Sequence, residues 1–190
     1  MNITVPNKVF SEAEVMQLYA ESYPKYKNKK KANGEDLPST RTPRATQSLF
    51  PPLTRQTPDG YYVAMDGDIL AGWAGWKKLD SNTYLTAGSL TLPDYRKNDI
   101  QSKLLWPKRN AMFGGAAVFT ITNNKSAKWI NFVDKFYPKV TIDKIPETIK
   151  ADVQEALDFY EEQGKNPNIF YKGPTEDSAM QKAWVIIKGE

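Results

Sequence analysis

The residues best placed to do chemistry lie at the junction between a predicted strand, residues 83–92, and a predicted helix, residues 100–113. Pro93 ends the strand, and Arg96 and Lys97 stand in the turn before the helix. The first N–H groups of a helix lack partners within it and carry positive partial charge, so they bind phosphate groups well. The two basic side chains add formal charge. The junction is therefore predicted to bind an anion; the alternative is an ordinary basic start of a helix.

Two residue types that carry much enzyme chemistry are missing, because the 190 residues include no cysteine and no histidine. Their absence excludes disulfides, thiolate nucleophiles, zinc sites built from cysteine, and imidazole general bases. Any proton transfer must use Asp, Glu, Tyr or Lys side chains, the substrate or water. We predict no metal site.

The elements that must position this junction begin with a hairpin. Residues 61–65 are predicted to form a strand and 69–79 the returning strand. Asp66 and Gly67 form the turn between them, because glycine takes a positive φ without cost. Together with 83–92 these strands make an antiparallel meander. The other predicted elements are helices at 11–22, 125–137 and 147–163 and strands at 116–121 and 183–187.

Local signals mark the ends of two of these helices. Ser11 with Glu14 three residues later has the pattern of a capping box at the start of helix 11–22. Helix 100–113 is predicted to end at the glycine pair that follows it, and Pro107 is predicted to kink or divide it.

The junction resembles the acyl-CoA-binding signature of the GNAT superfamily of N-acyltransferases. In that signature a strand ending in Pro-Asp/Glu-x leads into Arg-x-x-Gly-x-Gly/Ala and then into a helix with paired leucines. Residues 90–105 have this arrangement except at the two glycine positions. Residues 61–72 are similar to the central hairpin of the family, and 119–127 to its fifth strand and the start of the next helix. The resemblance covers roughly residues 59–140.

The resemblance implies an α/β (α+β) fold of the GNAT type, a central, mostly antiparallel twisted sheet flanked by helices. We expect a single domain over residues 1–190. It would carry a long loop rich in proline and lysine at 23–58 and an inserted helical segment at about 145–181, for which the family offers no counterpart.

The same resemblance implies which residues hold the cofactor. The strand before the turn would pair with the pantetheine arm, and the turn and helix start would hold the pyrophosphate. Asn124 would bond to the pantetheine arm or, alternatively, cap the following helix. The implied cofactor-binding residues are Leu90, Thr91, Leu92, Arg96, Lys97, Asn98, Asp99, Ile100, Gln101, Ser102 and Asn124.

Two positions depart from the family pattern. Asp99 and Gln101 stand where the signature has its glycines. Aspartate tolerates the left-handed conformation better than most residues, so the turn can persist, but its carboxylate would face a diphosphate. Gln101 adds bulk where the backbone would meet the ligand.

Candidate catalytic residues come from helix 125–137. Family enzymes often protonate the leaving thiolate with a tyrosine seven residues after the asparagine, a position that Asn131 occupies here. Tyr137 is the other candidate general acid, but it lies on the apolar stripe of its helix, which favours a role in the core.

These observations predict an acyl-CoA-dependent N-acyltransferase that uses acetyl-CoA or another acyl-CoA as co-substrate and an unidentified amine as acceptor. The alternative is a catalytically inactive GNAT-like module for binding or assembly. The net charge of +4 and pI of about 9.0 fit an anionic ligand but do not by themselves argue for nucleic acid. No signal peptide or membrane span is visible, so we expect a cytoplasmic location.

Overall fold

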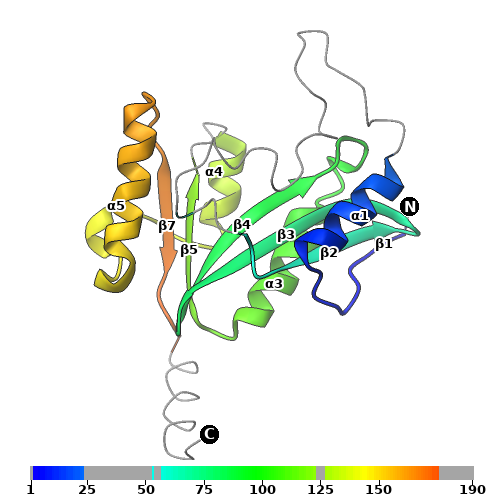
Figure 1. Ribbon diagram of the computed structural model, residues 1–190, viewed down its shortest axis with the longest axis horizontal. Coiled ribbons are helices and arrows are strands. Elements are labelled where there is room, and N and C mark those ends of the chain that lie inside the picture. The colour runs from blue at the N-terminus through cyan, green and yellow to red at the C-terminus, as the bar shows by residue number, and fades with distance from the viewer. Residues whose placement is uncertain (1, 24–52, 54–56, 123–126, 176–190) are drawn as a thin grey trace, which may run out of the picture. The chain divides into compact units, whose positions relative to one another are not determined.

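A computed structural model describes residues 2–23, 53, 57–122 and 127–175 of the chain. Its strands form a sheet in the order β1-β2-β3-β4-β5-β7-β6 (Figure 1). The β4–β5 pair is parallel, whereas β1–β2, β2–β3, β5–β7 and β6–β7 are antiparallel. This mixed sheet with flanking helices confirms the α/β fold predicted from the sequence.

The strands are β1 (Ile3–Thr4), β2 (Gly60–Asp66), β3 (Ile69–Asp80), β4 (Thr83–Thr91), β5 (Ala117–Thr122), β6 (Lys139–Val140) and β7 (Asn168–Lys172). The longer helices are α1 (Glu12–Ser22), α3 (Trp106–Phe113), α4 (Ala127–Asp134) and α5 (Glu147–Glu162). A short 3₁₀ helix, Pro93–Tyr95, follows β4, and a π-helical segment, Gln101–Leu105, runs directly into α3.

The chain divides into two compact units. The first comprises Met1–Phe50, Thr54–Lys77 and Ala87–Arg109, and the second Pro51–Leu53, Lys78–Thr86 and Asn110–Glu190. Strands β3 and β4 therefore contribute residues to both. The organisation of residues 1–190 as one domain stays a prediction.

In the first unit, α1 and the start of α3, residues 106–109, lie on opposite faces of β2 and β3 (Figure 1). Tyr19 of α1 meets Trp73 edge to face, with ring centroids 6.2 Å apart. On the other face, the ammonium of Lys108 lies 5.8 Å from the ring centroid of Tyr62, whose ring also packs against Trp76. Trp73 and Trp76 point to opposite faces because they are three residues apart in a strand, and both are buried.

In the second unit, α5 and α4 cover opposite sides of β5 and β7 (Figure 1). The core on the α5 side consists of Leu53, Leu85, Phe119, Ile145, Ile149, Val153, Ala156 and Ile169. The predicted helix 147–163 is confirmed as α5. Strand β7, which the sequence analysis did not predict, lies between β5 and β6 in the sheet, so the segment after residue 145 supplies a strand as well as a helix.

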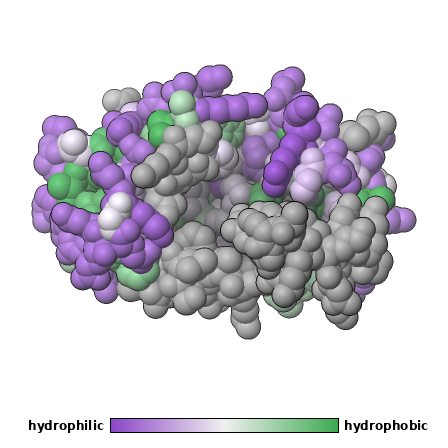
Figure 2. Space-filling model, turned by 90° about the horizontal axis from the view of Figure 1, so that it is seen from above, coloured by the Kyte–Doolittle hydropathy of each residue, from purple (hydrophilic) through white to green (hydrophobic). Residues whose placement is uncertain are grey.

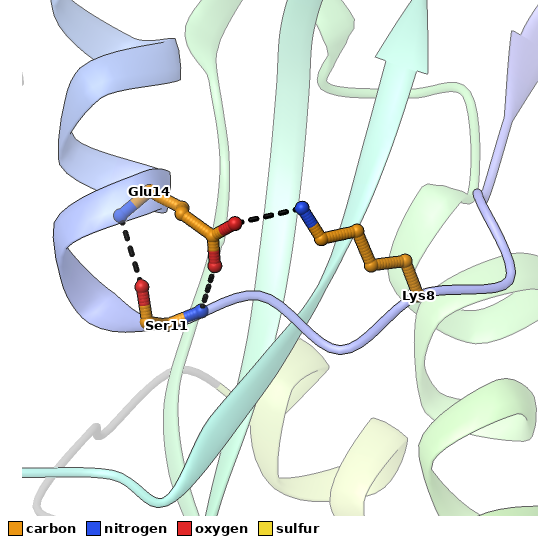
Figure 3. A network of polar contacts seen from close by, with 3 residues as sticks. All are labelled: Lys8, Ser11 and Glu14. Atoms are coloured by element: carbon orange, nitrogen blue, oxygen red, sulfur yellow. Dashed lines mark hydrogen bonds and ion pairs between the residues drawn. The ribbon is translucent and has the colours of Figure 1, made fainter.

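The start of α1 has the predicted cap. Ser11 Oγ accepts a hydrogen bond from Glu14 N at 3.2 Å, and the Glu14 carboxylate accepts one from Ser11 N at 2.7 Å (Figure 3). Lys8 adds an ion pair to the same carboxylate at 2.7 Å. These contacts lower the pKa of Glu14 to about 2, chiefly through the Lys8 hydrogen bond and then those of Ser11. The capping box is therefore confirmed.

The helix that starts at the junction ends as predicted. Gly114 and Gly115 follow Phe113 with φ values of 57° and 81°, which glycine adopts without strain. Near its start, Trp106 N–H bonds to Gln101 O, the i→i+5 pattern of a π-helix. This pattern ends immediately before Pro107, which has no N–H to donate. The predicted helix is thus divided near Pro107 into a π-helical segment and α3.

The predicted strand 183–187, most of the predicted loop 23–58, and residues 123–126 lie outside the described residues. Within the described part, no helix is long and apolar enough to cross a membrane. Figure 2 shows a face whose described residues are mostly hydrophilic, with hydrophobic ones in small separate groups.

Candidate functional site

The turn that leads from β4 into the helix has an unusual backbone. Lys97 and Asp99 have φ values of 85° and 53°, although neither is glycine. Such values are uncommon for residues with a Cβ, and aspartate tolerates them better than most. Asp99 thus takes the conformation that a glycine would supply at this position. The side chains of Arg96, Lys97 and Asn98 are exposed around the turn.

Hydrogen bonds hold both ends of this turn. Arg96 Nε donates to Thr91 O at 3.3 Å, and Asn98 Nδ2 donates to Tyr95 O at 3.0 Å. Tyr95 is buried, and its hydroxyl donates to Asp66 at 3.3 Å. Desolvation, followed by the charge of Asp66, raises the pKa of Tyr95, so its hydroxyl stays protonated and remains a donor at neutral pH. The 3₁₀ segment is thereby fixed to the end of β2.

Asp99 also begins the helix. Its carbonyl accepts a hydrogen bond from Lys103 N at 2.8 Å and another from Ser102 Oγ at 3.1 Å. Its carboxylate forms an ion pair with the Lys103 ammonium at 3.0 Å. The negative charge of Asp99, at a glycine position of the signature, is therefore balanced by Lys103. Arg96 and Lys97 in the turn and Lys103 in the first turn of the helix are all exposed.

Gln101, at the second family glycine position, turns its side chain inward. Its amide Nε2 lies 3.2 Å from Trp73 O, 2.9 Å from Leu90 O and 3.2 Å from Thr91 Oγ1. An amide NH₂ has two hydrogens, so one of them is shared between acceptors. The Gln101 side chain, predicted to obstruct a ligand, thus points into the protein. There its amide links β3, β4 and the helix.

Two glycines let β4 approach β3 closely. A Cβ on Gly72 would lie 2.6 Å from Leu90 O, and a Cβ on Gly75 would collide with Ala87 O. Gly72 belongs to the predicted hairpin, and the structure shows that a glycine is needed there because of this contact with β4. Both glycines are therefore required by the path of the strand that carries the predicted pantetheine-binding residues.

Within β4, Gly88 has φ = 59°, a left-handed conformation that glycine adopts without strain. Gly88 is exposed, and the three following residues, Ser89, Leu90 and Thr91, are half-buried. The ladder of β4 with β5 joins Thr83–Leu85 to Ala117–Phe119. Leu92 N bonds to Ala71 O at 2.9 Å and is buried.

Tyr61 lies near Gly88, and its sequence position did not single it out. The Cε1 atom of its ring lies 4.0 Å from where a Gly88 Cβ would be. The side chain is buried, and its hydroxyl has no hydrogen-bond partner within the described residues. Desolvation, with a smaller contribution from the Glu12 carboxylate, raises the pKa of Tyr61, so the phenol remains neutral. The local sequence pattern of a buried strand gives no sign that the Tyr61 ring lies near Gly88, or that its hydroxyl lacks a hydrogen-bond partner among the described residues.

The candidate catalytic residues belong to the second unit. Asn131 is exposed on α4. Tyr137 is 2% exposed, and its hydroxyl donates a hydrogen bond to Asn110 Oδ1. The buried hydroxyl of Tyr137 thus has an acceptor within the protein, as a tyrosine in the core needs. Asn124 lies outside the described residues. The roles of all three stay predictions.

No group of three or more acidic side chains in the described part of the chain could hold a metal ion. The turn carries the exposed side chains of Arg96 and Lys97 beside the first N–H groups of the helix, and these groups suit an anion. The remaining predicted contacts, Ile100 and Ser102, lie in the first turn of the helix; Ile100 is buried and Ser102 half-buried.

No protein-family model and no curated protein sequence matches the chain. Solved structures do match its fold. N-acetylglutamate synthase from Neisseria gonorrhoeae, complexed with coenzyme A and N-acetyl-glutamate, aligns with 93% of the chain at a TM-score of 0.51 and 13% identity. The same enzyme complexed with coenzyme A and L-arginine aligns with 92% at 0.51 and 11% identity.

The chain spans about a third of the length of that synthase, 36% and 34% in the two structures. A protein assigned to the GNAT-family acetyltransferases, from Desulfovibrio desulfuricans, is covered over 99% of its length by 90% of this chain, with a TM-score of 0.50 and 11% identity. At these identities the likeness concerns the fold. The chain has the fold of the GNAT acyl-CoA-dependent N-acyltransferases.

Proposed function

We propose that the chain is an acyl-CoA-dependent N-acyltransferase, with acetyl-CoA as donor and an amine as acceptor. The observation that carries the proposal is the left-handed turn at Lys97 and Asp99, which follows β4 and opens directly into a helix. A backbone of this shape aims helix N–H groups at one point, and Arg96 and Lys97 supply charge beside it. This combination fits the diphosphate of coenzyme A.

The reaction proposed is direct attack of the amine nitrogen on the thioester carbonyl carbon. The new C–N bond forms, the C–S bond breaks, the nitrogen loses a proton and the thiolate gains one. Such a reaction requires a polarised carbonyl and a neutral amine. Residues Leu90–Leu92 would align the pantetheine arm by backbone hydrogen bonds, as an added strand does.

The neighbours of known structure include an enzyme complexed with N-acetyl-glutamate. An amino acid is therefore one acceptor class to test, alongside polyamines and peptide N-termini. The proposal does not depend on which of these is accepted.

The second candidate is a GNAT-like binding or assembly module without activity. One observation favours it, the exposed Asp99 carboxylate in the turn. It puts negative charge on the surface that a diphosphate would meet. A module of this kind would bind a partner without releasing coenzyme A.

Thermal melting with and without acetyl-CoA tests the proposal. Ligand about 100-fold above its dissociation constant stabilises a protein by about 2.7 kcal/mol, or roughly 5–10 °C for a chain of this length. Turnover is then measured as thiol release with a thiol-specific dye across a panel of amines. The dye reports coenzyme A alone because the chain has no cysteine. A melting temperature unmoved by millimolar acetyl-CoA would contradict the proposal, whereas binding without turnover would favour the inactive module.

A further inference from the structure

Ser89 stands next to the left-handed Gly88 in β4, at the accessible part of that strand. Gly88 is exposed and Ser89 is half-buried. The side chain of Ser89 meets the helix that follows the turn, through contacts with Trp106 and Arg109. All four residues belong to the first unit.

The hydroxyl oxygen of Ser89 accepts two hydrogen bonds. Trp106 Nε1 donates to it at 3.2 Å, and Arg109 Nη1 donates at 3.3 Å. A serine hydroxyl has two acceptor lone pairs and one O–H donor. Since both lone pairs are engaged, the group can interact with anything else only as a donor. The two donors on α3 therefore fix the orientation of the Ser89 hydroxyl and leave it only its O–H group for a further hydrogen bond.

The donor side of this arrangement is held firmly. Arg109 is 0% exposed, and its guanidinium lies 4.4 Å from the ring centroid of Trp106. Its Nη1 also lies 3.3 Å from Gly75 O. Arginine keeps its charge in proteins, and burying a charge is costly unless partners hold it. A charged donor on the Ser89 oxygen polarises the O–H bond and makes it a stronger donor.

We propose that Ser89 donates a hydrogen bond to the carbonyl oxygen of the bound thioester, and that Trp106 and Arg109 hold its hydroxyl in this orientation. This inference rests on the proposed acyl transfer and adds a residue to it. When the amine attacks, the carbonyl electron pair moves to the oxygen, and a fixed donor stabilises that charge. The pair returns as the C–S bond breaks. Ser89 keeps its proton throughout; the amine proton passes to water, and the thiolate takes a proton from water.

The test uses acetyl-CoA labelled with carbon-13 at the carbonyl, and isotope-edited infrared spectroscopy of the full chain. A hydrogen bond to a carbonyl lowers its stretching frequency. We expect the bound carbonyl band of the wild-type protein to lie below that of free acetyl-CoA. In Ser89→Ala the band should move back toward the free value, and in Ser89→Thr, which keeps a hydroxyl, it should stay low. Ser81→Ala, an exposed serine in the turn between β3 and β4, is the matched control and should leave the band unchanged.

Removing Ser89 leaves two buried donors without that acceptor, so Ser89→Ala can lose stability. Trp106→Phe provides a second route, because it keeps the serine and frees one of its lone pairs. We expect an intermediate band position in this variant, since the hydroxyl can then rotate. Melting curves recorded with each spectrum establish that the protein measured is folded.

The outcomes distinguish the role of Ser89 from the proposed acyl transfer. A carbonyl band that is the same in wild type, Ser89→Ala and Trp106→Phe, with acetyl-CoA bound in all three, overturns the role of Ser89 and leaves the proposed acyl transfer standing. Failure of the wild-type protein to bind acetyl-CoA overturns both.

Discussion

The carboxylate of Asp99 lies 3.0 Å from the ammonium of Lys103, one helical turn further along the chain. Both side chains are largely exposed, at 57% and 74% respectively, so the pair is worth little to stability. Its importance is local. Asp99 stands where the GNAT signature has a glycine, in the turn predicted to bind a diphosphate. Its carboxylate pairs with Lys103, a cation that could otherwise face the phosphates.

We predict that Asp99→Asn tightens the binding of coenzyme A. Asparagine tolerates the left-handed φ of this position, so the turn should persist. The substitution removes a negative charge from the site and releases Lys103 toward the phosphates. The gain should be about 1 kcal/mol, as for one pair of unit charges in water, and should shrink with added salt. Calorimetric titration measures it.

Asp68→Asn is the matched control, because Asp68 is an exposed acid in the turn between β2 and β3. It should leave the affinity as it is. Equal affinities in wild type and Asp99→Asn at low salt would show that the turn does not hold the diphosphate.

Gly72→Ala should destabilise the fold by about 1–3 kcal/mol, the usual cost of overpacking. The added Cβ would lie 2.6 Å from Leu90 O, and a backbone oxygen cannot move aside as a side chain can. Urea unfolding measures the change. Gly173→Ala is the control, since its Cβ would meet only the Tyr171 ring, at 4.0 Å. A wild-type midpoint for Gly72→Ala would mean that β4 lies further from β3 than described.

The capping box should make stability depend on pH at the acid end. The pKa of Glu14 is lowered from its ordinary 4.5 to about 2 by Lys8 and Ser11. A lowered pKa in the folded state stabilises the protein above the unfolded value, and this contribution disappears as the pH falls through the folded value. Wild type should therefore lose its advantage over Glu14→Gln between about pH 4.5 and pH 2.

Denaturant unfolding of both proteins over this range provides the measurement. Lys8→Met should show a smaller dependence than wild type, because it removes the largest cause of the shift and leaves the Ser11 contacts. A constant difference between wild type and Glu14→Gln down to the lowest pH would contradict the prediction.

Tyr137→Phe should lower stability by about 0.5–1.5 kcal/mol, the net worth of one intramolecular hydrogen bond. The hydroxyl of Tyr137 is buried and donates to Asn110. Asn110→Ala should cost a similar amount, and the double variant should cost less than the sum, since both changes remove the same bond. If Tyr137→Phe instead abolished thiol release while melting as wild type does, the tyrosine would be the general acid rather than a core residue.

Local patterns predicted most of the first unit. The hairpin of β2 and β3 follows from the Asp66-Gly67 turn between two mainly apolar runs, and the start of α1 follows from Ser11 and Glu14, because these signals lie within a few residues of each other. The junction after β4 was recognised for the same reason. The left-handed Asp99 was anticipated from its place in the motif, and its φ of 53° agrees.

Strand β7 was missed because its five residues, Asn168–Lys172, carry too few alternating positions to be distinguished from a loop. It is a strand because β5 and β6 pair with it from either side. No pattern in residues 168–172 contains that information, since the partners come from elsewhere in the chain.

The sequence by itself determined the order of the elements around the junction, the basic turn and the absence of cysteine and histidine chemistry. Only the tertiary structure decided what Gln101, Gly72 and Ser89 do. Gln101 reaches carbonyl groups of two strands, Gly72 lies under Leu90 O, and Ser89 accepts from two residues of a helix. Each of these roles is a contact between residues distant in sequence, and such contacts exist only after the strands and the helix have packed together.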